Sequence, residues 1–262
     1  MPPPARIVCL TEETVETLYL LGESERIVGV SGFVVRPPEA RRKPKVSTFT
    51  DAKTDEIVAL KPDLVFTFSD IQADIAANLI REGIEVHAFN HRTVEGIFDM
   101  MRTVGALIGE PAKAASLCET MQAKINDTRR RAESRRIRPR VYFEEWDDPM
   151  ISAIGWVSEL IEIAGGENVF ADLAKEQGAK DRIVSAEQVI SAQPDIIIGS
   201  WCGKGFKQQS VVNRPGFSAI PAVKNDRLYE IKSAVILQPG PAALSDGLDE
   251  LLTIMQDIER SS

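Results

Sequence analysis

The sequence predicts an α/β protein of two lobes, each with a mostly parallel β-sheet, joined by one long α-helix. Two observations predict the lobes: a stretch of the first half recurs in the second half, and both halves alternate strands with helices. A third observation predicts the connection, because an uninterrupted helical segment separates the halves. With 262 residues, 44% of them hydrophobic, the chain is long enough to bury a core in each lobe.

The clearer internal repeat combines a short helix, a Pro-Asp turn and a buried strand. It covers residues 55–69 (DEIVALKPDLVFTFS) and residues 187–201 (EQVISAQPDIIIGSW). Proline stops the helix, and the apolar run that follows suits a strand that is buried on both faces of a parallel sheet. Both halves are therefore expected to contain the same structural unit.

A looser repeat opens each half. An apolar strand at residues 6–10 precedes a helix that ends at Gly22, and a strand at residues 140–143 precedes a helix that ends at Gly165 and Gly166. Glycine just after the last apolar position is a typical end of a helix. The same units in the same order favour strand–helix alternation, and therefore a mostly parallel sheet, in each lobe.

Helical sequence connects the two repeats. Residues 94–107 have helical periodicity, and residues 112–134, which follow Pro111, contain neither glycine nor proline. At 1.5 Å per residue the second segment would span about 35 Å, which is enough to bridge two lobes; the alternative is an ordinary surface helix. We therefore predict an N-terminal lobe at residues 1–93, a helical linker at 94–137 and a C-terminal lobe at 138–262.

Composition excludes several classes of protein. The net charge of −8 argues against nucleic-acid binding, because phosphate contacts need a basic surface. The three cysteines form no CxxC pair and there are only two histidines, so we predict no metal site and no disulfide framework. No apolar run approaches the roughly 20 residues that span a bilayer, so we expect no membrane-embedded segment.

The N-terminal sequence bears on location. Residues 1–6 lead directly into an apolar strand pattern, without the charged, apolar and cleavage regions of a secretory signal. We therefore expect a cytoplasmic protein. The alternative is a periplasmic protein whose signal was removed from this sequence.

The candidate ligand-binding residues follow predicted strands, because ligands of open parallel sheets bind beyond the carboxyl ends of the strands. The three tryptophans fall at or after such ends, where aromatic faces beside polar groups suit a flat or amphipathic ligand. The alternative is that each one closes a core, above all Trp156. The predicted site residues are Glu12, Glu13, Phe33, Ser69 and Asp70 in the first lobe and Glu144, Trp146, Trp156, Trp201 and Lys232 in the second.

A cluster of four carboxylates stands in residues 144–148 (EEWDD). It could hold a hard cation through oxygen ligands, pair with a cationic group of a ligand, or line a solvated loop. Because side chains alternate along an extended segment, Glu144 and Glu145 are expected to face different ways, so that only one of them enters a cleft between the lobes.

No catalytic group is predicted. Cys202 would become nucleophilic if Lys204 lowered the pKa of its thiol. However, both histidines belong to the first lobe, so no nucleophile–base pair can be identified in the sequence. Cys9 and Cys118 lie in apolar surroundings and are expected to be buried.

Several motifs, in this order, resemble those of the cobalamin- and siderophore-type substrate-binding proteins of ABC importers, the class III periplasmic binding proteins. The resemblance covers nearly the whole chain, and although each motif is short, their order and spacing are specific. The motifs are residues 6–10 (RIVCL), 17–22 (TLYLLG), 26–30 (RIVGV), 61–65 (KPDLV), 165–170 (GGENVF), 193–198 (QPDIII), 214–217 (RPGF) and 220–225 (IPAVKN).

The resemblance implies two Rossmann-like lobes joined by one long helix, a layout shared with chelatases. It also implies a ligand such as a corrinoid, a ferric siderophore, haem or a similar metal chelate in the cleft between the lobes. No cofactor would be required, and cobalamin, haem or a ferric siderophore would be present only as the bound ligand. The protein would be a monomer that serves an ABC importer.

An ABC permease is the partner that the resemblance implies, and here the sequence departs from the family. Importer-bound relatives carry an exposed Glu on each lobe that docks on the permease. Ala73 and Asp74 stand near the first such place, and Leu237 and Gln238 near the second. Leucine cannot form an ion pair, so the docking carboxylates match poorly, and a cytosolic relative that carries or senses a cofactor is the alternative.

Two other functions remain open at this point. One is an enzyme of metal or tetrapyrrole chemistry with a chelatase-like fold, in which Glu12, Glu144 or Asp147 accepts a proton. The other is a cytosolic partner protein with a vestigial cleft. A shared fold does not assign chemistry, and the scarcity of histidine counts against the enzyme. We therefore predict ligand binding without turnover.

Overall fold

The computed structural model describes residues 2–135 and 137–260, and it divides into two compact units. Unit 1 comprises the described residues up to His91 together with Glu95–Met121, and unit 2 comprises Arg92–Val94 and the described residues from Gln122 onward. The chain passes from unit 1 to unit 2 within helix α5. The predicted lobe and linker limits stay a prediction, and residues 1, 136, 261 and 262 of those ranges lie outside the described part.

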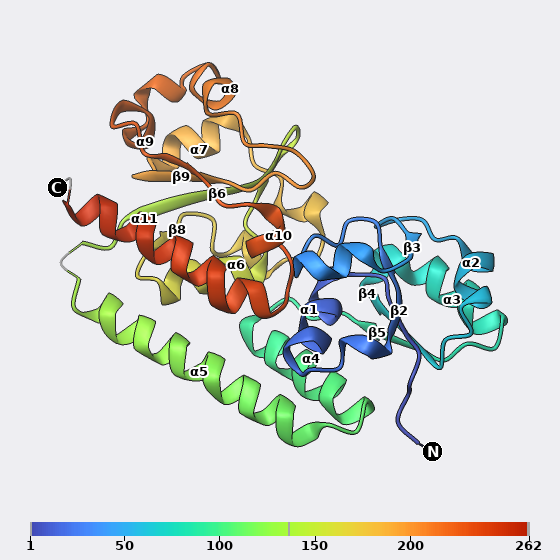
Figure 1. The fold of residues 1–262 in the computed structure, drawn as a ribbon. Coiled ribbons are helices and arrows are strands. Elements are labelled where there is room, and N and C mark those ends of the chain that lie inside the picture. The colour runs from blue at the N-terminus through green and yellow to red at the C-terminus, as the bar shows by residue number, and fades with distance from the viewer. Residues whose placement is uncertain (1, 136, 261–262) are drawn as a thin grey trace. The chain divides into compact units, whose positions relative to one another are not determined.

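Unit 1 is built around a five-stranded parallel sheet with the strand order β3-β2-β1-β4-β5 (Figure 1). The strands and the helices that belong wholly or mostly to this unit are β1 (Ile7–Cys9), α1 (Glu12–Leu20), β2 (Ile27–Ser31), β3 (Lys45–Ser47), α2 (Thr54–Ala59), β4 (Leu64–Phe68), α3 (Ala73–Arg81), β5 (Val86–Phe89) and α4 (Val94–Leu107).

The core of unit 1 follows from its continuous apolar strands. Every residue of β1 and β4 is buried, as expected where helices cover both faces of a parallel sheet. On one face, Val8 and Val65 pack with Ile57 of α2 and Leu79 of α3. The alternation of side chains directs Cys9 to the opposite face, where it is buried as predicted.

Unit 2 contains a second sheet with the order β10-β9-β6-β7, in which β8 also pairs with β6. All pairings are parallel except that of β6 with β7. Its elements are β6 (Arg140–Asp147), β7 (Met150–Ser152), α6 (Gly155–Ile163), β8 (Glu167–Asn168), α7 (Ala186–Ala192), β9 (Ile196–Gly199), α8 (Gln208–Val212), α9 (Pro221–Lys224), β10 (Leu228–Glu230), α10 (Ser233–Ile236) and α11 (Leu248–Arg260).

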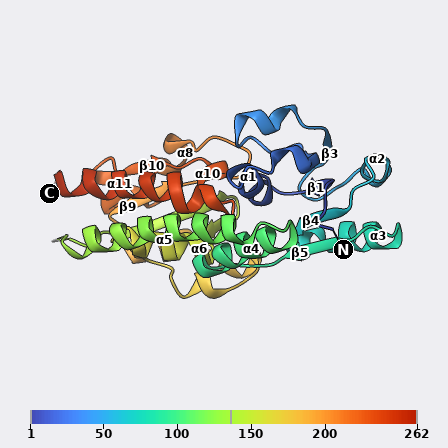
Figure 2. The same ribbon diagram turned by 60° about the horizontal axis from the view of Figure 1, so that its bottom comes forward.

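Helix α5 (Pro111–Glu133) is the long helix that the sequence predicts, and Pro111 occupies its first position. Both views show α11 lying beside the part of α5 that belongs to unit 2 (Figures 1 and 2). Within unit 2 the two helices are joined by an ion pair of 2.5 Å between Lys124 Nζ and Asp249 Oδ2. Among the residues described, no helix combines the length and the apolar character that crossing a membrane requires.

The internal repeat extends to individual hydrogen bonds. In unit 1, Asp63 Oδ2 accepts from Arg6 N at 2.8 Å, and the Arg6 guanidinium donates to the carbonyl of Leu60. In unit 2, Asp195 Oδ2 accepts from Arg140 N at 2.9 Å, and the Arg140 guanidinium donates to the carbonyl of Ala192. The Pro-Asp turn is thus fastened to the start of the first strand in the same way in both units.

One predicted element differs from the structure. The strand expected at residues 140–143 continues to Asp147, and β6 then forms an antiparallel pair with β7 before helix α6 begins. This extension carries Glu144, Glu145 and Asp147, whose polarity is typical of a loop, so the sequence does not indicate a strand there. Ion pairs described below are what allow these side chains to lie on a sheet.

Each sheet has one point at which the strand order reverses. In unit 1 the chain builds β2 and β3 on one side of β1, and then β4 and β5 on the other. In unit 2 it builds β7 and β8 beside β6, and then β9 and β10 on the other side. Ligands of open α/β sheets bind beyond the carboxyl ends of the two strands that flank such a point. The carboxyl ends of β1 and β4 and those of β6 and β9 are therefore the positions at which the fold favours ligand binding.

Candidate functional site

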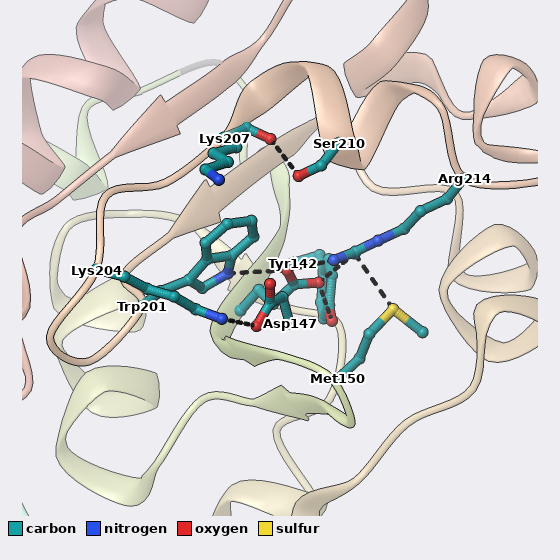
Figure 3. A network of polar contacts seen from close by, with 9 residues as sticks. Tyr142, Asp147, Met150, Trp201, Lys204, Lys207, Ser210 and Arg214 are labelled. Atoms are coloured by element: carbon teal, nitrogen blue, oxygen red, sulfur yellow. Dashed lines mark hydrogen bonds and ion pairs between the residues drawn. The ribbon is translucent and has the colours of Figure 1, made fainter.

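A buried carboxylate organises the reversal point of unit 2. Glu144, at the end of β6, is fully buried, and Arg214 pairs with both of its oxygens, Nη1 to Oε2 at 2.5 Å and Nη2 to Oε1 at 2.9 Å. Tyr142 Oη donates to Oε2 at 2.9 Å, and Trp201 Nε1 donates to Oε1 at 3.0 Å. Figure 3 shows the indole and the guanidinium approaching from opposite sides. The carboxylate is therefore satisfied by groups of the chain itself.

The titration of this network follows from burial and charge. Burial raises the pKa of Tyr142 well above its ordinary range, and the adjacent Glu144 carboxylate adds to the effect. For Arg214, burial works to lower the pKa, but the hydrogen bonds and charge of Glu144 outweigh it and raise the pKa. Both groups accordingly stay protonated and continue to donate to Glu144 at any physiological pH.

The other carboxylates of this strand have cations of their own. Arg182, which is almost completely buried, contacts Glu145 at 2.5 Å, and Lys204 contacts Asp147 at 2.5 Å. Glu144 and Glu145 thus meet different partners, Arg214 and Arg182, which confirms that they face different ways. Three of the four carboxylates are thus held in intramolecular ion pairs, while contact of the cluster with a cationic group of a ligand stays a prediction. No group of carboxylate, histidine or cysteine side chains in the described chain is arranged to hold a metal ion.

The three tryptophans have different environments. Trp156 and Trp201 are each 2% exposed, and Trp156 Nε1 donates to the Ile236 carbonyl at 2.9 Å. Trp146 is half-buried, and its Nε1 donates to the carbonyl of Asp148 at 2.9 Å. Of the three tryptophans, Trp146 is thus the one that stays partly exposed. The ligand contacts predicted for Trp156, Trp201 and the buried Glu144 stay predictions.

The loop of residues 201–207 follows β9 and places Lys204 next to Trp146. The Lys204 ammonium lies 3.9 Å from the centroid of the Trp146 ring and 5.2 Å from that of Trp201. The loop is held by Phe206, whose ring packs edge-on against Trp201 at 5.1 Å and whose N–H donates to Glu230 Oε1 at 2.9 Å. Lys232, a predicted site residue, is exposed and pairs with Glu230 at 2.6 Å.

The close approach of Phe206 to the sheet requires a glycine. A Cβ added at Gly199 would lie 1.9 Å from the Phe206 ring. We expect Gly199→Ala to displace this ring and to lower the unfolding free energy by about 1–3 kcal/mol, as overpacking of a core does. Urea unfolding followed by tryptophan fluorescence measures the loss.

Gly205→Ala is the matched control, because the nearest atom to an added Cβ there is Glu230 Oε1 at 3.9 Å. Its unfolding midpoint should change little. Equal midpoints for Gly199→Ala and wild type would contradict the proposed role of the glycine.

The reversal point of unit 1 holds two buried carboxyl groups. Glu12 accepts a hydrogen bond from Val35 N at 3.0 Å. Glu13, 1% exposed, accepts one from Thr11 Oγ1 at one oxygen, while its Oε2 has no hydrogen-bond partner. Burial, partly offset by these hydrogen bonds, raises the pKa of each carboxyl to about 7. Both groups therefore titrate near neutral pH.

A glutamine that the sequence analysis missed joins the two strand ends of unit 1. Gln72 is fully buried. Its side chain donates to the Leu10 carbonyl at 3.3 Å, after β1, and accepts from Phe68 N at 3.0 Å, in β4. Ser69 between them has φ +59, a left-handed conformation that is uncommon outside glycine. The predicted residues Ser69 and Asp70 thus lie on a constrained turn at this edge.

Exposed apolar side chains stand at the same edge. Phe33, which follows β2, is 55% exposed, and Ile71, which follows β4, is 51% exposed. Both side chains are thus accessible to an apolar surface of a ligand. In unit 1 the structure therefore places all five predicted residues after β1, β2 or β4, with the two glutamates buried and Phe33 accessible.

Two residues of unit 2 had weak signals in the sequence. Lys204 stands between two glycines directly after a predicted strand, which is a typical setting for an accessible charged residue. Arg214 lies in the RPGF motif, 70 positions from its partner Glu144. No local sequence pattern connects Arg214 with Glu144, so only the structure reveals this ion pair.

Comparisons with known proteins agree with this fold. A model of the family described as periplasmic binding protein matches residues 7–235, and so includes both units. An uncharacterized ABC transporter substrate-binding lipoprotein of Bacillus subtilis is 27% identical over 95% of this chain and 79% of its own. The vitamin B12-binding protein of Vibrio parahaemolyticus is 27% identical over 93% of this chain and 86% of its own.

Solved structures show the same architecture. The periplasmic vitamin B12 binding protein BtuF of Vibrio cholerae has a TM-score of 0.79 at 23% identity and covers 99% of both chains. The periplasmic heme-binding protein RhuT of Roseiflexus sp. RS-1, in its apo form, has a TM-score of 0.80 at 25% identity and covers 95% of this chain and 98% of that one. The predicted class of fold, two lobes with mostly parallel sheets and one long helix, is thereby confirmed.

Proposed function

Because the chain belongs to the periplasmic binding protein family, we propose that it binds a metal chelate of the corrinoid, haem or siderophore type for an ABC importer. The family resemblance predicted from the motifs is confirmed by the match over residues 7–235. The family consists of substrate-binding proteins and not of enzymes, in agreement with the prediction of binding without turnover. The observation that carries the proposal is this match, which includes both strand-reversal points.

The class of ligand rests on the relatives and on the side chains at the two edges. Relatives over almost the whole chain are named for binding vitamin B12 and heme, which are both flat metal macrocycles. Phe33 in unit 1 and Trp146 in unit 2 offer accessible aromatic surface beside polar groups. Aromatic faces with few polar neighbours suit a flat ring, so we propose that Phe33 and Trp146 take part in ligand binding.

The enzyme alternative gains no support from the carboxylates of unit 2. Glu144 accepts four hydrogen bonds from Arg214, Tyr142 and Trp201. Burial works to raise the pKa of Asp147, but the hydrogen bond and charge of Lys204 outweigh it and lower the pKa. Neither group is therefore arranged as a proton acceptor, and ligand binding fits the site better.

The proposal includes a permease partner and a location. Membership of an ABC substrate-binding family implies a small-molecule ligand and a permease. Asp74 is exposed at the start of α3 and Leu237 is half-buried after α10, so we propose that docking uses Asp74 on unit 1 and a contact other than an ion pair on unit 2. Since relatives are named as periplasmic or as lipoproteins, we propose the periplasmic alternative for the location.

We expect the purified protein to form a stable one-to-one complex with haem, cyanocobalamin or a ferric siderophore. A ligand that binds only the native state stabilises it, by about 2.7 kcal/mol when its concentration is one hundred times Kd. The measurements are an absorbance titration, which gives the stoichiometry, and a melting curve, which should move to higher temperature. The absence of any complex with all three classes would overturn the proposed class of ligand.

Matched variants test the two edges. Phe33→Ala and Trp146→Ala should each weaken the complex about tenfold, since an aromatic contact contributes about 0.5–1.5 kcal/mol beyond its buried area. Ile80→Ala is the control, because Ile80 is exposed at the other end of α3 and should leave Kd unchanged. Unchanged affinity in both edge variants would remove those edges from the site.

A further inference from the structure

Lys204 occupies the part of unit 2 that a ring ligand would use. Its ammonium lies 3.9 Å from the centroid of the Trp146 ring, which is the one tryptophan of the three with an accessible surface. The position reflects attraction between a cation and the face of an aromatic ring. A flat ligand that stacks on this face of Trp146 must therefore contact the ammonium or displace it.

The ammonium is held in place by one carboxylate, and the pair is open to solvent. Lys204 Nζ lies 2.5 Å from Asp147 Oδ1, and the two side chains are 40% and 24% exposed. An ammonium has three N–H donors and no acceptor. Lys204 can consequently donate to a second anionic oxygen, or exchange Asp147 for it, without leaving the Trp146 face.

The loop does not depend on Lys204 for its conformation. Trp201 is fixed by its hydrogen bond to Glu144, and Phe206 by its packing at Gly199 and its hydrogen bond to Glu230. Lys204 lies between these two anchors, directly after Gly203, whose φ of +73 favours glycine. The lysine side chain is therefore presented by a fixed turn, and an exposed pair such as Lys204–Asp147 contributes little to stability.

Two other cations near the loop already have carboxylate partners. Arg214 pairs with Glu144, and Lys232 pairs with Glu230. Lys207 lies on the same loop with an exposed side chain, and its carbonyl accepts a hydrogen bond from Ser210 (Figure 3). Of these cations, Lys204 is the one that lies over the ring of the partly exposed Trp146.

We propose that Lys204 is a specificity-determining residue, which selects ring ligands that carry an anionic oxygen group at their rim. The inference rests on the proposed function and deepens it. A neutral ring that stacks on Trp146 displaces the ammonium and gives it no new partner. A ring with a carboxylate at its edge replaces that contact by a charge-assisted hydrogen bond, which is stronger than a neutral one.

The test uses pairs of ligands that share a ring and differ in rim charge. One pair is iron protoporphyrin IX, which is the acid, and its neutral dimethyl ester. The other pair is a monocarboxylic acid of cyanocobalamin and neutral cyanocobalamin itself. Kd is measured for wild type, Lys204→Met, Lys204→Arg and the control Lys207→Met, at low and at high salt. Lys204→Met keeps the length and apolar stem of the side chain and removes its charge.

For each ring that it binds, we expect wild type to bind the acid about tenfold more tightly than the neutral form. The ratio of the two Kd values should be smaller at high salt, because salt screens exposed charges. Lys204→Met should bind both forms equally, whereas Lys204→Arg and Lys207→Met should keep the preference. Melting curves should show all variants folded.

The outcomes separate this inference from the proposed function. If wild type binds acid and neutral forms equally, or if Lys204→Met keeps the full preference, Lys204 does not determine specificity, although the protein remains a binder of such rings. If wild type binds neither ring class in any form, the proposed ring ligands are wrong and this inference is wrong with them.

Discussion

Replacing Arg214 with alanine is expected to lower the free energy of unfolding by roughly 3–5 kcal/mol, because it leaves a buried carboxylate without its cation. Glu144 is fully buried, and the cation that pairs with it in the described part of the chain is Arg214, which binds both of its oxygens at 2.5 and 2.9 Å. The hydrogen bonds from Tyr142 and Trp201 would remain but carry no full positive charge.

Tryptophan fluorescence suits this measurement. All three tryptophans lie in unit 2, and Trp201 donates directly to Glu144. Urea unfolding followed by this signal therefore reports the unit that carries the substitution. We expect the midpoint to fall in proportion to the loss of free energy, with little change in slope.

Two further variants make the result specific. Arg130→Ala removes a cation whose side chain is 73% exposed and pairs with Asp127 at 2.9 Å, so its effect should stay below about 1 kcal/mol. The double variant Glu144→Leu, Arg214→Met should lose less than Arg214→Ala, because no uncompensated charge remains. A single-variant loss as small as that of Arg130→Ala would show that Glu144 does not need its cation.

The parts of the fold that the sequence predicts are those with a local physical cause. A buried parallel strand is apolar at nearly every position, and a Pro-Asp turn ends the helix before it. These signals located β4 and β9, together with the helices α2 and α7 that precede them. The absence of glycine and proline located α5 in the same way.

The site depends on contacts that have no local signal. The ion pair of Glu144 with Arg214 joins residues 70 positions apart, and the strand end that carries Glu144 reads as a loop because its partners are not adjacent in sequence. The sequence predicts where a strand ends, but it does not predict whether a side chain that follows the strand points into the core or toward solvent. Trp201 and Trp146 both follow strands, yet one is buried by a hydrogen bond to Glu144 and the other keeps an accessible face.

The second large effect that we expect is a pH-dependent stabilisation by Glu13→Gln. The Glu13 carboxyl has its pKa raised from the ordinary 4.5 to about 7, chiefly by burial. Below pH 4.5 the carboxyl is protonated in both the folded and the unfolded protein, so it does not affect stability. As the pH rises toward 7, the unfolded protein releases the proton first, and folding becomes progressively less favourable.

The pKa of Glu13 differs between the folded and the unfolded protein, and each pKa unit is equivalent to about 1.4 kcal/mol. Above pH 7 the ionisation of Glu13 therefore lowers the free energy of unfolding by about 3 kcal/mol. Glutamine resembles the protonated carboxyl in shape and carries no charge. The variant should therefore match wild type near pH 4 and exceed it by up to about 3 kcal/mol at pH 8. Hydrogen exchange of the amides in β1 and α1 measures the difference within unit 1, which contains no tryptophan.

Glu187→Gln provides a control of opposite sign. Hydrogen bonds from Ser185 and from the backbone lower the pKa of this exposed carboxyl, so its charge favours the folded state, and the variant should become less stable than wild type as the pH rises. A gain for Glu13→Gln that is the same at pH 4 and pH 8 would mean that burial does not hold the Glu13 proton. A gain that grows through neutral pH would show that the reversal point of unit 1 maintains an uncompensated carboxyl at the expense of stability, as binding sites commonly do.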